Sequence, residues 1–238
     1  FLRQDENLGF AKANNLAIKK SKGEYILLLN PDTKLPKDSI SSVISKLDDN
    51  LEVGIATCKV VLSSGRIDPA SHRGFPTPWA SLTYFLKLDK YYPRSKLFGQ
   101  YHLTYKDLDK EHEIDSPSGA FFMIRRKVID EIGLLDEDYF MYAEDLDWAY
   151  RAKKKGWKVM YYPNPSVIHY KGVSSGIKSH SISAQSRESR QRSIKAFYDT
   201  MLLFYKKHME KNYPFLINFL VKAAINAKRQ IALIRLSV

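Results

Sequence analysis

The run EYILLLN, residues 24–30, most constrains how this chain can fold. A continuous apolar run of this length is typical of a strand that is covered on both faces of its sheet. A second run, VGIATCKVVL, occupies residues 53–62, and amphipathic helical patterns precede the two runs at 9–20 and about 37–48. This alternation of helix and strand predicts an α/β fold with a mostly parallel sheet.

The alternation stops after residue 62. Residues 63–113 contain four prolines, many aromatic residues and only one amphipathic piece, near 79–88. A long irregular segment inside a compact domain is usually functional or mobile. The remaining patterns predict strands at SGAFFMIRR (118–126), WKVMYY (157–162) and SVIHY (166–170), and helices at KVIDEIG (127–133), from the acidic cluster to about Lys155, at 187–211 and at 214–236.

The positive charge is concentrated at one end of the chain. Residues 1–170 hold 25 Lys and Arg against 23 Asp and Glu, whereas residues 171–238 hold 13 against 3. A uniformly basic protein would suggest nucleic acid as a partner, but here the body is almost neutral. A basic, apolar-rich tail instead favours an anionic surface, with a membrane as the first candidate, so we expect no nucleic acid partner.

The helix predicted at 214–236 is amphipathic, and this suggests that residues 213–238 bind an anionic membrane. Its apolar face holds Leu216, Leu220, Ala227, Ile231 and Ile234, and its polar face holds Asn218, Lys222, Asn226 and Arg229. Packing on the catalytic domain, or on a second subunit of a homo-oligomer, is the alternative.

Cysteine content and hydropathy exclude several other classes of protein. The single cysteine, Cys58, rules out an intrachain disulfide framework and a cysteine-rich zinc site, and its apolar strand predicts a core position. No segment reaches the roughly 20 apolar residues of a spanning helix. No signal peptide pattern is visible.

Asn30, Pro31 and Asp32 follow the first buried run directly. Open α/β sheets bind ligands at the carboxyl ends of their strands. A carboxylate at such a position can hold a divalent cation, and the cation can in turn hold a diphosphate. Asn, Pro and Asp are also common turn residues, so a simple turn is the competing interpretation.

The densest acidic cluster of the chain lies in FMYAEDLDWAYR, residues 140–151. Glu144, Asp145 and Asp147 stand between aromatic residues, which would desolvate a carboxylate and raise its pKa, as a general base requires. Acids in the first turn of a helix are also stabilised by the helix dipole, so helix electrostatics alone can explain the cluster. Asp147 is predicted to pair with Arg151 one turn later.

Two further features allow a structural or a functional interpretation. His169 ends an apolar run; a lone histidine is more often structural, although a neutral imidazole binds Mn²⁺-like metals beside carboxylates. Small residues in SPSGA, 116–120, suit the close approach of a ligand or merely a tight bend.

The order of these motifs resembles a known family. NLGFAKANN, GEYILLLNPDT, SGAFFMIRR, FMYAEDLDWAYR and HYKGVSS follow one another as in the family 2 glycosyltransferases, and most resemble the rhamnosyltransferase-like branch that builds bacterial surface polysaccharides. The resemblance covers residues 5 to about 205. It implies the GT-A fold, an α/β/α sandwich of Rossmann-like type, and inverting transfer from a nucleotide-diphosphate sugar.

The resemblance also implies roles for individual residues. Asp32 matches the last acid of the metal and diphosphate motif, whose first position is Asn30 here although many members have Asp. His169 matches a histidine that completes the metal site, which implies a divalent cation, Mn²⁺ or Mg²⁺, as cofactor. Asp145 matches the presumed catalytic base, with Glu144 orienting the acceptor or the base.

Binding of the donor and acceptor is implied for three more residues. Gly119 and Ala120 match the acceptor-side strand, and Trp148 would form part of the wall of a sugar site. The implied donor is dTDP-rhamnose, with UDP-linked hexoses or galactofuranose behind it, and the implied acceptor is a glycan or a lipid-linked glycan. The location expected from this is cytoplasmic, at the inner face of the cell membrane.

The family's first strands, which bind the nucleotide, have no counterpart in this chain. We therefore expect residues 1–172 to form a GT-A catalytic domain truncated at its N-terminus, followed by a basic helical extension, residues 173–238. The competing hypothesis is a catalytically inactive transferase-like domain that binds a glycan or a partner.

Overall fold

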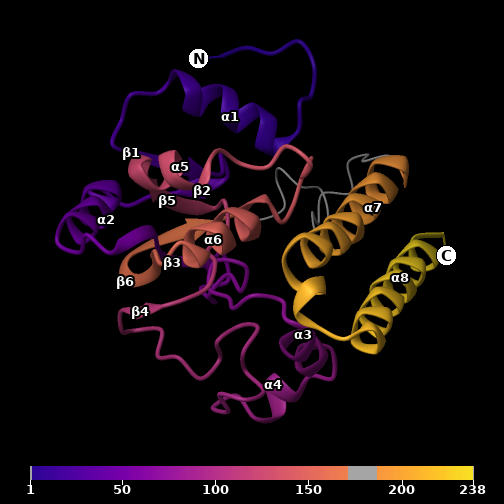
Figure 1. The fold of residues 1–238 in the computed structure, drawn as a ribbon. Helices are drawn as coiled ribbons and strands as arrows, with labels where there is room; N and C mark the ends of the chain where they lie inside the picture. The colour runs from indigo at the N-terminus through magenta and orange to yellow at the C-terminus, as the bar shows by residue number, and fades with distance from the viewer. Residues whose placement is uncertain (1, 171–186, 238) are drawn as a thin grey trace.

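The computed structural model describes residues 2–170 and 187–237 (Figure 1). Most elements lie close to the spans that the sequence predicts. In chain order they are α1 (Phe10–Lys20), β1 (Tyr25–Leu29), β2 (Thr33–Lys34), α2 (Ser39–Asp48), β3 (Val53–Leu62), α3 (Pro78–Phe85), α4 (Leu88–Tyr91), β4 (His112–Glu113), β5 (Phe121–Arg125), α5 (Arg126–Ile132), α6 (Glu144–Lys154), β6 (Lys158–His169), α7 (Arg187–Phe204), a π turn η1 (Tyr205–Met209), a 3₁₀ turn η2 (Glu210–Asn212) and α8 (Phe215–Ser237).

The strands form one mixed sheet, so the prediction of a mostly parallel sheet is wrong. The order is β1-β5-β3-β6-β2, with β4 paired to β6. Among the strands of residues 2–170 and 187–237, only β3 and β6 pair in parallel; β5 is antiparallel to β1 and β3, and β2 and β4 are antiparallel to β6. A parallel neighbour requires a crossover connection, usually a helix packed on the sheet. The segment between β3 and β5 contains α3 and α4, but neither contributes a side chain to the two cores that face the sheet.

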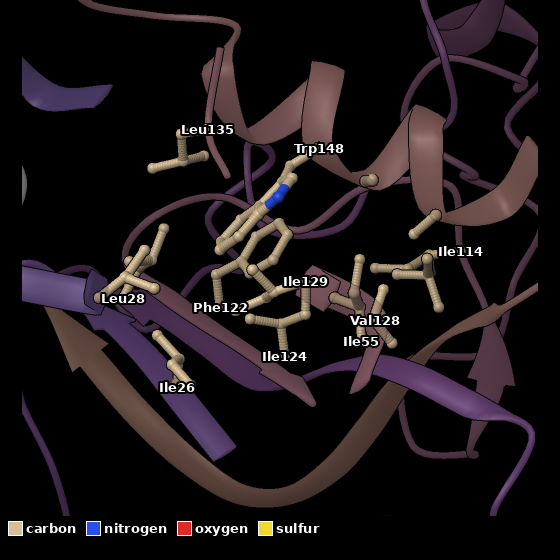
Figure 2. Close-up of a cluster of buried hydrophobic side chains, with 14 of the residues drawn as sticks. Ile26, Leu28, Ile55, Ile114, Phe122, Ile124, Val128, Ile129, Leu135 and Trp148 are labelled. Carbon is tan, nitrogen blue, oxygen red and sulfur yellow. The ribbon is translucent and has the colours of Figure 1, made fainter. Parts of the chain in front are cut away.

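Helices cover both faces of the sheet, as the predicted α/β/α sandwich requires. Side chains of α1, α5 and α6 pack on one face, and Trp148 of α6 stacks on Phe122 of β5 (Figure 2). Val43 and Leu47 of α2 pack on the other face, where Cys58 of β3 is fully buried, as predicted. The apolar strands are therefore enclosed on both sides, which explains why their sequences do not alternate with polar residues.

The last strand differs from its predicted form. WKVMYY and SVIHY were expected as two strands around a turn, but they are parts of one strand, β6. Pairing with β3 skips residues 163–165, because Cys58 is opposite Tyr162 and Lys59 is opposite Ser166. The two prolines cannot donate ladder hydrogen bonds, and the structure places them in this irregularity, so the strand continues past them.

The two C-terminal helices pack on the body of the chain. Phe204, Tyr205 and Met209, at the end of α7 and in η1, form an apolar cluster with Tyr139 and with Leu146 of α6. The predicted domain boundary at 172/173 and the KGVSS part of the last motif lie outside the described residues. In the part of the chain that the structure describes, no helix is long and apolar enough to cross a membrane.

Candidate functional site

The structure brings Asn30, Asp32 and His169 together at one end of the sheet. β2 pairs with β6 so that Thr33 is opposite His169, and this register places the turn between β1 and β2 beside the end of β6. His169 Nε2 lies 3.2 Å from Asp32 Oδ1 and 3.3 Å from Asn30 Nδ2. The side chains of Asp32 and His169 are almost completely buried. Residues from two distant parts of the sequence, Asn30 with Asp32 and His169, therefore form one polar cluster.

Asp68, which no sequence motif marks, orients His169. Its Oδ2 lies 2.9 Å from His169 Nδ1, and its side chain is fully buried. A carboxylate can only accept a hydrogen bond, so the N–H group at Nδ1 donates this hydrogen bond to Asp68. The Nε2 atom therefore faces Asp32 and Asn30. A carboxylate on the far nitrogen is the arrangement that commonly orients metal-binding histidines.

The donor set fits a divalent cation only if a ligand supplies part of the coordination sphere. Among the described residues, no group of three or more His, Cys, Asp or Glu side chains is arranged to hold a metal by itself. Asp32 and His169 offer two donors close together. Mg²⁺ in phosphate-transfer sites is held by one or two carboxylates, with water and substrate phosphates as further ligands. The pair is therefore compatible with a cation that arrives with a diphosphate.

Gly119 and Ala120 lie beside this cluster, in the turn before β5. A Cβ atom at Gly119 would meet the Phe10 ring at 3.2 Å and Asn30 Oδ1 at 3.8 Å. The carbonyl of Ala120 accepts a hydrogen bond from Thr33 Oγ1 at 3.4 Å. Gly119 and Ala120 therefore lie next to the polar cluster, and the close contact with Phe10 explains why residue 119 is a glycine.

The acidic cluster begins a helix, as predicted. Glu144 and Asp145 are the first two residues of α6, and both are more than nine-tenths buried. Two consecutive residues before them, Tyr142 and Ala143, have positive φ angles of 73° and 65°. Bulky residues rarely adopt this conformation, and such strain occurs most often at ligand and active sites.

Arg73 forms an ion pair with Asp145, with 2.8 Å between Nη2 and Oδ2. The other carboxylate oxygen of Asp145 accepts from the backbone N–H of Leu146 at 2.7 Å. Arg73 Nη2 also donates to the carbonyl of Pro117, two residues before Gly119. The predicted base is therefore held at both oxygens, and Arg73 links it to the turn beside the first cluster.

The pKa of Glu144 is raised to about 8, first because the side chain is buried and second because Asp145 is negatively charged. The neighbouring Arg73 opposes this rise only in part. A carboxyl group with a pKa near neutral can both accept and release a proton at physiological pH. The sequence predicted that burial would raise the pKa of at least one carboxyl group in this cluster, and Glu144 is such a group.

Asp147 has a structural role. Its Oδ2 pairs with Arg151 Nε at 2.7 Å, which confirms the predicted pair. Its Oδ1 lies 2.7 Å from Nε2 of His208, a residue of η1. Asp147 therefore joins α6 to the C-terminal helices.

Trp148 is a core residue, and this placement does not support its predicted part in a sugar site. The side chain is fully buried, its ring stacks on Phe122 with centroids 5.7 Å apart, and its Nε1 donates to the carbonyl of Gly133 (Figure 2). An indole that faces the sheet cannot also face a ligand. The sequence could not predict which face of α6 packs on the sheet, because aromatic residues occur on both of its faces.

The motif NLGFAKANN holds the segment that precedes the acidic cluster. The N–H of Phe10 donates to the carbonyl of Phe140 at 2.7 Å. Asn15 is buried, donates to the carbonyl of Leu135 and accepts from the N–H of the same residue, at 2.8 and 3.0 Å. This motif is therefore explained by its contacts with residues 135–140, which lead to the acidic cluster.

The site thus consists of two clusters in an α/β/α sandwich. Asn30, Asp32 and His169 lie at the ends of strands, and the buried acids Glu144 and Asp145 begin α6. The family model described as "Glycosyltransferase like family 2" matches residues 1–195. The match covers most of the chain, so the chain belongs to the glycosyltransferase-like family 2.

Several curated relatives match at low identity. The N-acetylglucosaminyl-diphospho-decaprenol L-rhamnosyltransferase of Mycobacterium tuberculosis is 26% identical over 181 residues, which covers 71% of this chain and 58% of that protein. The rhamnosyltransferase WbbL of Escherichia coli K12 is 25% identical over 171 residues, 68% of this chain and 61% of the relative. The low-salt glycan biosynthesis hexosyltransferase Agl10 of Haloferax volcanii is 28% identical, over 63% of this chain and 44% of the relative. The chain thus spans about half of the length of these relatives.

Solved structures support the fold. GalNAc-T7 with UDP, GalNAc and Mn²⁺ aligns with a TM-score of 0.52 at 13% identity, over 96% of this chain and 43% of that chain. The mannosyltransferase PcManGT from Pyrobaculum calidifontis, in complex with GDP-Man and Mn²⁺, aligns with a TM-score of 0.51 at 14% identity, over 99% of this chain and 55% of that chain. At these identities the similarity concerns the fold alone.

Proposed function

We propose that this chain belongs to an inverting glycosyltransferase that moves a sugar from a nucleotide-diphosphate donor to a glycan or lipid-linked acceptor. The proposed pathway is cell-surface polysaccharide synthesis, and the favoured donor is dTDP-rhamnose, because two of the relatives are rhamnosyltransferases. The observation that carries the proposal is the meeting of Asn30, Asp32 and His169 at a strand end of a family 2 chain.

The proposed reaction is one displacement at the anomeric carbon. Asp145 accepts the proton of the acceptor hydroxyl while the acceptor oxygen bonds to the anomeric carbon. The bond from that carbon to the diphosphate oxygen breaks, and the diphosphate leaves with the electron pair. One displacement of this kind inverts the anomeric configuration. Glu144 orients the acceptor or the base, and its pKa of about 8 keeps the proton exchangeable near neutral pH.

Asp32 and His169 would hold a divalent cation, Mn²⁺ or Mg²⁺, at the diphosphate. The two aligned solved structures contain Mn²⁺ together with a nucleotide or a nucleotide sugar. A bound cation would neutralise charge on the leaving diphosphate. Within the chain, Asp68 fixes the orientation of His169. Asn30 offers a neutral amide where many family members have the carboxylate of an Asp, so the site has one fewer anionic ligand.

Substitution of the proposed base tests the reaction. In the full-length protein, Asp145→Asn should lower turnover of dTDP-rhamnose by about 10²- to 10⁴-fold, the usual contribution of a general base. Binding of the donor, measured by calorimetry, should change little, because the donor diphosphate is assigned to the Asp32 and His169 side. Unchanged turnover would remove Asp145 from this role, and a screen of UDP-linked sugars would test the choice of donor.

One observation favours the second candidate, a catalytically inactive domain that binds a glycan or a partner. Both carboxylate oxygens of Asp145 are already engaged, one by Arg73 and one by the N–H of Leu146. As a base, Asp145 must exchange one of these contacts for the acceptor hydroxyl. Glycan binding with no transfer to any acceptor and no hydrolysis of any donor would identify this second candidate.

The proposed place of action is the inner face of the cell membrane. Acceptors named for one relative contain a diphospho-decaprenol lipid. An enzyme that uses such an acceptor must reach the membrane surface, and the basic C-terminal residues are suited to an anionic surface.

A further inference from the structure

α8 turns polar side chains towards the protein and leaves its largest apolar side chains exposed, although Val221 and Ile225 also pack inward. Its polar side chains point towards α7 and the turns that follow it: Asn218 accepts from Tyr205 Oη at 2.6 Å, and Lys222 pairs with Glu210. Further along the helix, Arg229 pairs with Asp199 of α7 at 2.8 Å. A surface helix of a globular protein normally turns its apolar stripe inward and its charged face outward.

The apolar face of α8 is exposed. Eleven positions between 215 and 236 are exposed, and nine of them are apolar, the two others being Gln230 and Arg235. Six large side chains on this face are between 49% and 84% exposed: Phe215, Leu216, Phe219, Leu220, Ile231 and Ile234. The predicted division of the helix into two faces is therefore present, with the apolar face turned outward.

Exposed apolar faces of this kind mark interaction surfaces. The helix has 23 residues and is therefore about 35 Å long, and the six large side chains extend along most of that length. Ion pairs hold the opposite face on Glu210 of η2 and Asp199 of α7, so rotation of α8 to bury its apolar face would break them. The packing of α8 therefore keeps its apolar face exposed.

The charge around the face selects its partner. Residues 187–237 hold 11 Lys and Arg against 3 Asp and Glu, a net charge of +8. Lys211 is exposed just before the helix, and Arg235 is exposed near its end. A second copy of the chain would bring two such basic units together, and like charges repel. An anionic lipid surface offers both an apolar interior for the face and opposite charge for its borders.

We propose that α8 lies in the interface of an anionic bilayer, with its axis parallel to the membrane and its Phe215–Ile234 face inserted. α3 adds to this surface, because Lys228 of α8 lies 3.6 Å from the centroid of the Phe85 ring. Trp79, Leu82 and Leu86, in and just after α3, are also exposed. Binding of this kind needs no sugar donor or acceptor, so it deepens the proposed function without depending on transfer activity.

Vesicle flotation tests the proposal. The chain is mixed with phosphatidylcholine vesicles that contain or lack phosphatidylglycerol, with no donor or acceptor present. We expect binding to the anionic vesicles, weaker binding when salt is raised, and little binding to the neutral ones. The double variant Phe219→Ser, Leu220→Ser should lower the partition coefficient at least about tenfold, because two large apolar side chains no longer leave water.

A matched control separates this face from general hydrophobicity. Ile40 and Leu51 are also exposed, at 42% and 75%, and lie in and just after α2. Ile40→Ser, Leu51→Ser should bind vesicles as the wild type does. Absence of binding to anionic vesicles, or equal loss in the two double variants, would overturn the proposal. A dimer in light scattering that Phe219→Ser, Leu220→Ser abolishes would also overturn it, since a second copy would then cover the face. If the chain binds anionic vesicles but shows no transfer activity, the proposed enzymatic function fails and the proposed membrane binding stands.

Discussion

Arg73 donates to the carboxylate of Asp145 at 2.8 Å, and both side chains are at least about seven-eighths buried. The guanidinium is the counter-charge for a pair of adjacent acids that would otherwise be buried together, because Glu144 lies next to Asp145. A buried charge that loses its partner is costly, typically by about 3–5 kcal/mol.

Arg73→Gln should therefore destabilise the fold by about 3 kcal/mol or more, as measured by denaturant unfolding. Arg66→Gln is the matched control, because Arg66 is exposed in the same segment and should change stability by less than about 0.5 kcal/mol. Equal effects of the two substitutions would show that Arg73 does not compensate the acid pair.

The pH dependence of stability should report the burial of Glu144. Its pKa is about 8 in the folded chain, against an ordinary value of 4.5, because burial and the charge of Asp145 both favour the protonated form. Between these two pH values the folded chain keeps a proton that the unfolded chain releases, so stability falls as pH rises. The contribution is complete below about pH 4.5 and is lost above about pH 8.

Glu144→Gln keeps the shape of the side chain and removes its titration. We expect the free energy of unfolding of the wild type to fall between pH 5 and pH 8 by a few kcal/mol more than that of the variant. The comparison cancels the contributions of all other ionisable groups that the two proteins share. Parallel pH profiles would contradict the raised pKa.

Gly9 allows the close approach of α1 to the segment before the acidic cluster. Its φ is 78°, and a Cβ atom there would lie 2.5 Å from the carbonyl oxygen of Phe140. Gly65 has a similar φ of 76° with nothing within 4 Å of the same position. Gly65→Ala should therefore cost about 1 kcal/mol for the backbone alone, and Gly9→Ala clearly more, because Phe140 must move. Equal losses of thermal stability in Gly9→Ala and Gly65→Ala would show that Phe140 moves at little cost in free energy.

Asp68 should act on metal binding through His169. Asp68→Asn keeps the size of the side chain but removes the charge on the far side of the imidazole, and such changes typically lower metal affinity by about 10- to 100-fold. Titration with Mn²⁺ and a nucleoside diphosphate, followed by electron paramagnetic resonance, measures this affinity without turnover. Nitrogen NMR of His169 would report the tautomer directly. Asp109→Asn, at an exposed position, is the control and should leave both readouts unchanged.

The sequence predicted the layers of the fold well, because they depend on local patterns. The unbroken apolar run of residues 24–30 predicted a strand covered on both faces, and side chains of β1 do contribute to the cores on both faces of the sheet. The direction of β5 could not be predicted in this way, because it depends on the path of the long segment before it. The face of α6 that carries Trp148 was equally ambiguous, since periodicity describes faces without saying what covers them.

The candidate site was predictable only where residues form a motif. Asn30, Asp32 and His169 stand in recognisable motifs, and the register of β2 against β6 brings them together. Asp68 and Arg73 lie in the irregular segment, where no periodicity marks them. Asp68 directly precedes Pro69, and Arg73 lies between Pro69 and Pro76, but neither position indicates a partner in the folded chain.

Asp68 and Arg73 are five residues apart, yet one contacts His169 and the other contacts Asp145. The short covalent path between them connects the two clusters. We expect a displacement of Asp68 to move Arg73, the counter-charge of the acid pair, and a double-mutant cycle on Asp68 and Arg73 should then show non-additive effects on stability. Additive effects would show that the two clusters act independently.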